Sequence, residues 1–180
     1  MTHPAERFAQ SASKRKFTKS TIFAGNYPFD LDDFQINGCH ALEAGESVLV
    51  AAPTGSGKTL VGEFAIFLAL ERGKKAFYTT PIKALSNQKL RDFRHQFGAE
   101  NVGLLTGDLS LNREARIVVM TTEIFRNMLY AEADAGDDPL ADVEAVVLDE
   151  CERCLGLEPA LQHQRRAMGE GGRHGIGRTV

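Results

Sequence analysis

The sequence predicts an α/β fold in which a mostly parallel sheet is covered by helices on both faces. Apolar runs with the composition of strands alternate with stretches of helical character. The apolar runs are continuous, as is typical of strands buried on both faces of a sheet. A glycine-containing loop at residues 53–59 joins one such run to a helical stretch. The length of 180 residues suits one domain with a substantial core.

The predicted elements follow one another with short connections. The first helix covers residues 31–44 and ends at Gly45, and the first strand is Val48–Ala51. The helix after the loop ends near Arg72. The later strands are predicted at Lys75–Thr80, Val102–Leu105, Arg116–Met120 and Val143–Leu148, and the later helices from Pro81 to Phe97 and from Glu123 to Tyr130.

Composition excludes several classes of protein. The longest apolar run, Phe64–Leu70, is too short to cross a bilayer, so no membrane segment is predicted. The net charge of −3 does not indicate nucleic acid, so any such site must be local. Three cysteines, an odd number, argue against a disulfide framework and for a reducing compartment. We therefore expect a cytoplasmic location.

The loop before the second helix has the pattern of a phosphate-binding loop, or P-loop. Gly55 and Gly57 let the backbone wrap around phosphate oxygens, Lys58 is placed for the β- and γ-phosphates, and the Thr59 hydroxyl for Mg²⁺. The strict pattern begins with glycine, where this chain has Ala52. The departure is mild, because the later glycines are the ones that let the backbone surround the phosphate. The predicted nucleotide-binding residues of the loop are Pro53, Thr54, Gly55, Ser56, Gly57, Lys58 and Thr59.

Asp149 and Glu150 end the last predicted strand, where ligands bind in parallel sheets. Asp149 is predicted to hold Mg²⁺, directly or through water. Glu150 is predicted to orient and deprotonate an attacking water. A strand that runs into a polar turn looks the same, and the upstream P-loop is what favours the functional interpretation.

Several stretches resemble the motifs of a known family. They are, in chain order, residues 29–35, 52–59, 80–89, 105–108, 120–123 and 149–150. In this order they resemble the first, ATP-binding motor domain of superfamily-two helicases, in the DExH-box, superkiller-like class that remodels RNA. The resemblance covers residues 29–150 and implies a RecA-like fold, with ATP and Mg²⁺ as cofactors. It implies that Gln35 is the adenine ligand, with Phe29 or Phe34 packing beside it, and that Lys58 and Glu150 are catalytic.

The same resemblance implies binding of single-stranded RNA. The implied RNA-binding residues are Pro81, Lys83, Gly107, Thr121 and Thr122. Pro81 and Thr122 also suit helix starts, and a helix start can present N–H groups and hydroxyls to phosphates. Lys83 suits a phosphate contact or an ordinary surface charge equally well. Such contacts reach the nucleic-acid backbone, so recognition is expected to tolerate many sequences.

The chain departs from the family pattern after Glu150. The family has Asp-Glu-x-His, whereas residues 149–152 read Asp-Glu-Cys-Glu, which puts the coupling assigned to the histidine in doubt. The Ser-Ala-Thr motif and the second motor domain with its arginine fingers are absent from the sequence. The composition changes after Cys151, and residues 151–180 are predicted to be an out-of-frame tail or a truncated product, with true divergence as the alternative. The sheet is therefore expected to be incomplete at its C-terminal end, and residues 1–28 to form a flexible basic arm.

These features predict the N-terminal motor domain of an ATP-dependent RNA helicase, with an RNA-processing or RNA-degradation complex as the implied partner. One alternative is a non-catalytic fragment that binds ATP and RNA, because the arginine finger is missing. A DNA translocase of the same superfamily is the other, although residues 80–89 and 121–123 favour RNA. By itself this chain is expected to hydrolyse ATP slowly or not at all, since an arginine finger contributes about 10³–10⁵ in rate.

Overall fold

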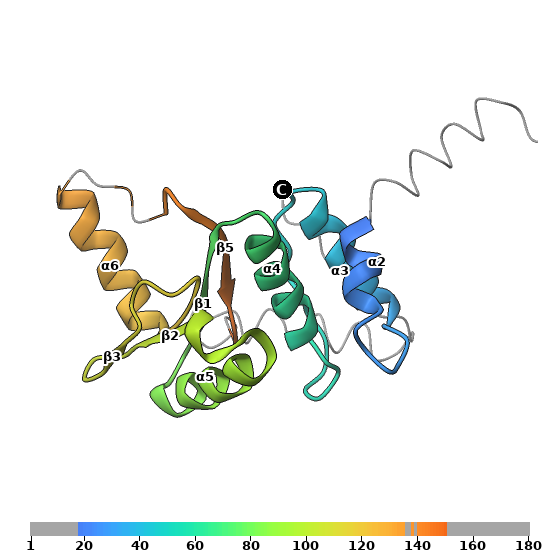
Figure 1. The fold of residues 1–180 in the computed structure, drawn as a ribbon, viewed down its shortest axis with the longest axis horizontal. Coiled ribbons are helices and arrows are strands. Elements are labelled where there is room, and N and C mark those ends of the chain that lie inside the picture. The colour runs from blue at the N-terminus through green and yellow to red at the C-terminus, as the bar shows by residue number, and fades with distance from the viewer. Residues whose placement is uncertain (1–17, 136–137, 139, 151–180) are drawn as a thin grey trace, which may run out of the picture. The chain divides into compact units, whose positions relative to one another are not determined.

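The computed structural model describes residues 18–135, 138 and 140–150 (Figure 1). They fall into two compact units, one made of the described residues up to Phe64 and the other of those from Ala65 onward. Helix α4, Thr59–Glu71, contributes residues to both. The predicted tail, residues 151–180, lies outside the described residues.

The first unit consists of α2 (Thr18–Ala24), α3 (Asp33–Glu43), the P-loop and the start of α4. Phe23 of α2 is buried, with its ring centroid 5.1 Å from that of Phe64. The carboxylate of Glu43 accepts hydrogen bonds from the backbone N–H groups of Lys19 and Ser20, which satisfies donors that a helix start leaves unpaired. The arm predicted for residues 1–28 is therefore wrong for its described part, because an apolar face and a cap pack α2 into this unit.

The second unit contains a five-stranded sheet. Its strands are β1 (Lys75–Thr80), β2 (Val102–Leu105), β3 (Ser110–Leu111), β4 (Ile117–Thr121) and β5 (Val143–Leu148). Their order is β3-β2-β4-β1-β5, and every neighbouring pair is parallel except β2 and β3. The prediction of a mostly parallel sheet is confirmed.

Helices cover both faces of this sheet (Figure 1). Helix α5, Lys83–Phe97, packs its Phe93 on the face that carries Tyr78 and Val119. Helix α6, Thr122–Ala135, packs its Phe125 on the opposite face, which carries Phe77. Successive residues of β1 thus enter different cores, as the alternation of side chains along a strand requires. A short 3₁₀ helix, Ala99–Asn101, leads into β2.

Most predicted elements are present in the structure, with several differences at their bounds, among them a longer last helix that extends to Ala135 instead of Tyr130. Val48–Ala51 forms no strand and has only a single bridge residue, Leu49. Among the described strands, whose order is β3-β2-β4-β1-β5, none pairs with this segment, and a strand without a neighbour cannot pair its backbone groups. The helix expected to begin at Pro81 begins two residues later, at Lys83, and β3 was not predicted. Within the described residues no helix has the length and apolar character needed to cross a membrane.

Candidate functional site

The P-loop precedes α4, and its two glycines have the backbone conformation that a tight loop needs. Gly55 has φ 83° and Gly57 has φ 79°, a backbone region that side chains with a Cβ disfavour. A Cβ on Gly57 would also lie 2.6 Å from Nε2 of Gln35, whereas one on Gly55 would meet nothing within 4 Å. Gly57 is therefore required both by its backbone conformation and by the close approach of Gln35.

Lys58 lies against the carbonyl oxygens of its own loop. Its Nζ donates to the carbonyl of Ala52 at 2.5 Å and to that of Pro53 at 3.3 Å. An ammonium carries three protons, so two such bonds leave donor capacity for an anion. The predicted contact of Lys58 with the β- and γ-phosphates stays a prediction, for which the third proton of the ammonium is available.

The donor set of the loop fits a phosphate group. The Ser56 hydroxyl is buried and has no hydrogen-bond partner among the described residues. A buried polar group without a partner is costly, and a bound phosphate oxygen would supply one. Ser56, Lys58 and the backbone N–H groups at the start of α4 together provide the donors that such an anion needs.

Gln35 connects the start of α3 to the P-loop. Its Oε1 accepts from the backbone N–H of Asp32 at 2.9 Å, and its Nε2 donates to the carbonyl of Gly57 at 3.1 Å. Only 5% of the residue is exposed. Gly38 allows α3 to approach α4 closely, since a Cβ there would lie 3.0 Å from Cγ1 of Val61. The close packing of α3 on α4 thus holds the amide of Gln35 against the backbone of the P-loop.

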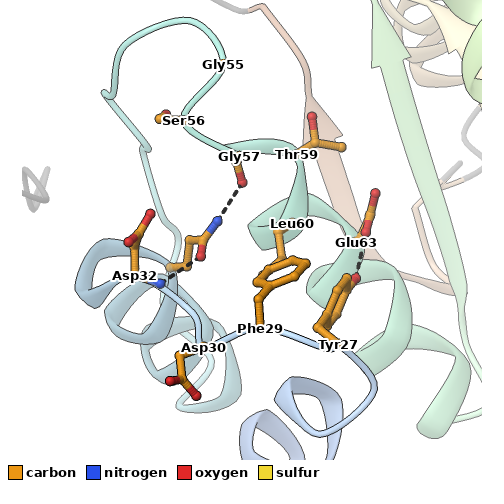
Figure 2. Close-up of a pocket in the computed structure, with 11 residues that line it drawn as sticks. Tyr27, Phe29, Asp30, Asp32, Gly55, Ser56, Gly57, Thr59, Leu60 and Glu63 are labelled. Carbon is orange, nitrogen blue, oxygen red and sulfur yellow. Dashed lines mark hydrogen bonds between the residues drawn. The ribbon is translucent and has the colours of Figure 1, made fainter.

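A cavity of about 390 Å³ lies within the first unit beside the P-loop (Figure 2). This volume falls in the usual range for small-ligand sites. Gln35, Gly57 and Thr59 line it, and so does Phe29, which is 55% exposed. Phe34, the other candidate for packing beside adenine, is buried at 5% exposure and is not among the lining residues. Of the two, Phe29 therefore has the position for stacking on a base.

Two further lining residues were missed by sequence reasoning. Tyr27 lies beside Phe29, with ring centroids 5.4 Å apart, and its hydroxyl donates to Oε2 of Glu63 at 2.8 Å (Figure 2). Glu63 follows Thr59 by one helical turn, so both face the same side of α4. That spacing was the available indication in the sequence.

Asp149 follows β5 in the second unit, as predicted. Its Oδ2 accepts from the Tyr78 hydroxyl at 2.7 Å, and its Oδ1 from the backbone N–H of Glu150 at 3.1 Å. A carboxylate has about four lone-pair sites, so acceptor capacity remains for a hard cation. No three acidic, histidine or cysteine side chains among the described residues form a metal cluster. Mg²⁺ fits such a sparse site, because it takes most of its ligands from phosphate and water.

Glu150 has φ 50°, a strained value for a residue other than glycine. Strain of this kind is concentrated at functional sites, which agrees with the predicted role of Glu150 as a base. Thr59 belongs to the first unit and Asp149 to the second, and their joint role as metal ligands stays a prediction.

The predicted RNA-binding residues lie together at one edge of the sheet. Parallel strands β2, β4 and β1 are neighbours, and their carboxyl ends lead into Gly107, Thr122 and Pro81 respectively. Thr122 is the first residue of α6, and its hydroxyl donates to the carbonyl of Thr80 at 3.2 Å. Thr121, the last residue of β4, precedes it. The topology therefore brings these residues together, while contact with RNA stays a prediction.

Lys83, the charged member of this group, forms an ion pair with Asp108. Hydrogen bonds from Lys83 and from the Thr106 hydroxyl hold the pKa of Asp108 below its usual value. Both partners of the pair are well exposed, so water screens the attraction and an incoming phosphate can compete for Lys83.

Comparison with known proteins agrees with this geometry. Residues 32–171 match the DEAD/DEAH box helicase family. The "Probable helicase HelY" of Mycobacterium tuberculosis (strain ATCC 25618 / H37Rv) is 59% identical over 128 residues, which are 71% of this chain and 14% of that protein. The "Antiviral helicase SKI2" of Saccharomyces cerevisiae and the "Superkiller complex protein 2" of Homo sapiens are each 51% identical over 127 residues, 71% of this chain and 10% of each relative.

A solved structure shows the same fold. The crystal structure of a hypothetical ATP-dependent RNA helicase from Sulfolobus tokodaii matches with a TM-score of 0.55 and 24% identity, and the match covers 81% of this chain and 45% of that one. The RecA-like fold and the resemblance to superkiller-like helicases are thereby confirmed. The chain spans 14% or less of the length of the three relatives named above. It belongs to the DEAD/DEAH box helicase family, as a motor domain of the DExH-box, superkiller-like class.

Proposed function

We propose that this chain binds Mg-ATP at the P-loop and single-stranded RNA at the carboxyl edge of the sheet, as the N-terminal motor domain of an ATP-dependent RNA helicase. The observation that carries the proposal is the cavity where Gln35 meets Gly57. It combines an exposed aromatic ring, an amide and a phosphate-binding loop, and these match the base and the phosphates of a nucleotide.

Adenine suits the amide of Gln35 chemically. A glutamine amide can accept from N6–H and donate to N7 of adenine, whereas guanine presents an oxygen in place of the N6 amino group. The amide retains a second proton on Nε2 and a second lone pair on Oε1 beyond the bonds seen here. Glu150 would act as the base that activates water, and Asp149 with Thr59 would hold Mg²⁺, which neutralises charge on the phosphates.

RNA, rather than protein or lipid, suits the edge formed by Pro81, Lys83, Gly107, Thr121 and Thr122. Hydroxyls, a helix start and one lysine suit phosphate oxygens, and none of these groups reads a base edge. Two relatives from Arabidopsis thaliana that are named "DExH-box ATP-dependent RNA helicase", 54% and 47% identical over 127 and 142 residues, support RNA over DNA. The human relative, named as a protein of a complex, supports a complex as the setting. An RNA-processing or RNA-degradation complex as the partner and a cytoplasmic location are part of the proposal.

Fluorescence anisotropy with labelled single-stranded oligonucleotides tests the nucleic-acid half of the proposal. We expect weak binding that tolerates different sequences, with unlabelled RNA competing better than DNA of the same sequence. Only a few phosphates are contacted, so log K should fall with log salt by roughly 0.7 per contact. Lys83→Ala should make this slope shallower, while Lys74→Ala, at an exposed ion pair with Asp142, should not. Equal competition by DNA would contradict the preference for RNA, and binding that ignores salt would contradict recognition through the backbone.

A further inference from the structure

Tyr78 is a buried residue of β1, and its hydroxyl contacts Asp149, the candidate metal ligand. Its side chain is 1% exposed, and its hydroxyl donates to Oδ2 of Asp149 at 2.7 Å. The two residues are 71 positions apart in the sequence, and the parallel pairing of β1 with β5 brings them together. A hydroxyl bound to a carboxylate is a charge-assisted donor, which is stronger than a bond between neutral groups.

Strand β1 holds the backbone of Asp149 as well as its side chain. The N–H of Asp149 donates to the carbonyl of Thr79 at 3.0 Å, which extends the strand pairing by one residue past Leu148. The carboxylate is therefore restrained from two sides, by Tyr78 on Oδ2 and by the N–H of Glu150 on Oδ1. The remaining lone pairs then have defined directions before any cation arrives.

Helix α5 holds the Tyr78 ring in turn. The Phe93 ring meets it edge-on, with centroids 4.9 Å apart and planes at 80°. Nζ of Lys89 lies 5.6 Å from the Tyr78 ring centroid, within the range of a cation–π interaction. A positive charge over a phenol ring draws electron density from it and favours donation by the hydroxyl. Packing and charge thus direct the Tyr78 proton toward Asp149.

We propose that Tyr78 is a positioning residue for the metal site, which acts by fixing the carboxylate of Asp149 for a divalent cation. The inference rests on the proposed function, because the cation is the Mg²⁺ of bound ATP. Groups that hydrogen-bond a metal ligand orient it and tune its basicity, and their loss typically costs 10–100-fold in metal affinity. A purely structural role, in which Asp149 only satisfies a buried hydroxyl, predicts a loss of stability without a specific loss of metal binding.

Tyr78→Phe in the full chain separates these roles, because it removes the hydroxyl and keeps the ring. Mn²⁺ is the probe, since it prefers the same oxygen ligands as Mg²⁺ and is visible by electron paramagnetic resonance. We expect the affinity of the ATP-bound protein for Mn²⁺ to fall about 10-fold. ATP affinity in EDTA should be unchanged. Tyr130→Phe, the same chemical change at a side chain that is 70% exposed, should alter neither quantity.

A double mutant tests whether the effect passes through Asp149. In an Asp149→Asn background, Tyr78→Phe should cause no further loss of Mn²⁺ affinity. If the unmodified chain binds ATP in a metal-dependent way and Tyr78→Phe keeps the same affinity for Mn²⁺, the role inferred for Tyr78 is wrong. The proposed function would not be affected by that result. Equal ATP binding by the unmodified chain with Mg²⁺ and with EDTA would overturn the metal role of Asp149 in the proposed function, and the inference with it.

A measurement on the chain without substitutions covers the case in which Tyr78→Phe does not fold. With 3-fluorotyrosine in place of tyrosine, fluorine NMR reports each ring separately. Adding Mn²⁺ to the ATP-bound protein should broaden the Tyr78 resonance strongly and the Tyr130 resonance little. Equal broadening of the two would place the cation away from Asp149 and would contradict the proposal.

Discussion

At the scale of single residues, Gln35 combines a structural role with the role proposed for it in binding adenine. Its Oε1 caps the start of α3 through the N–H of Asp32, and its Nε2 reaches the carbonyl of Gly57. Oε1 keeps a second lone pair for N6–H of adenine and Nε2 keeps a second proton for N7, so a substitution that keeps one atom and changes the other separates the two contacts.

Gln35→Glu makes that separation. The carboxylate still accepts from Asp32, as glutamate does at this helix position in capping boxes. Its second oxygen faces the Gly57 carbonyl in a site that is 5% exposed, so thermal stability should fall. The carboxylate has no proton to donate to the Gly57 carbonyl or to N7 of adenine. N7 is an acceptor in both purines, and a carboxylate oxygen can still accept from N6–H of adenine. We therefore expect Gln35→Glu to weaken ATP binding, measured by calorimetry, while any preference for ATP over GTP is kept, whereas Gln96→Glu, at an exposed position of α5, should change neither. An unmodified chain that binds ATP and GTP equally would show that Gln35 does not select adenine.

At the same scale, sequence reasoning found the residues of contiguous motifs and missed those defined by contacts between distant segments. Gly55 and Gly57 stand in a pattern whose spacing alone implies their backbone conformation, and both have the expected positive φ. The role of Tyr78 depends on a partner 71 positions away, and no local pattern marks it. A short loop specifies its conformation through neighbouring residues in the sequence, whereas the contact of Tyr78 with Asp149 is specified only by the pairing of two distant strands.

At the scale of elements, the predicted strands that form are those with a neighbouring strand among the described residues. Lys75–Thr80 and Val143–Leu148 were predicted at the bounds that the structure shows. Strand β1 is buried, as its continuous apolar run predicts, whereas β5 alternates between half-buried and exposed residues. Val48–Ala51 has a similar composition but only an isolated bridge. Propensity is thus insufficient for a strand, which needs a partner along its hydrogen-bonding edge.

The hairpin of β2 and β3 depends on Gly103. A Cβ at this position would lie 2.1 Å from the carbonyl oxygen of Asn112, so Gly103→Ala must displace the backbone of the returning strand. We expect a loss of about 1–3 kcal/mol in the free energy of unfolding, measured by urea denaturation. Gly107→Ala is the matched control, because a Cβ there would meet nothing within 4 Å. Equal stability of the two variants would show that the hairpin does not pack as described.

At the scale of the whole molecule, the chain carries the two sets of groups to which the proposed function assigns ATP and RNA. The P-loop and Gln35 belong to the first compact unit, while Asp149, Glu150 and the edge proposed for RNA belong to the second. The order of the motifs along the chain predicted both sets, because each lies at a turn with a characteristic sequence. The family match then joins them into one motor domain.

Binding of Mg-ATP at the P-loop is the central claim, and isothermal calorimetry on the full chain and on Lys58→Ala tests it most directly. Removing Lys58 takes away the ammonium that now bonds the Ala52 and Pro53 carbonyls and that phosphates would engage. We predict that the unmodified chain and Lys74→Ala bind Mg-ATP with equal affinity and that Lys58→Ala shows no measurable binding. Undiminished affinity in Lys58→Ala, with its fold intact by circular dichroism, would contradict the assignment of the loop.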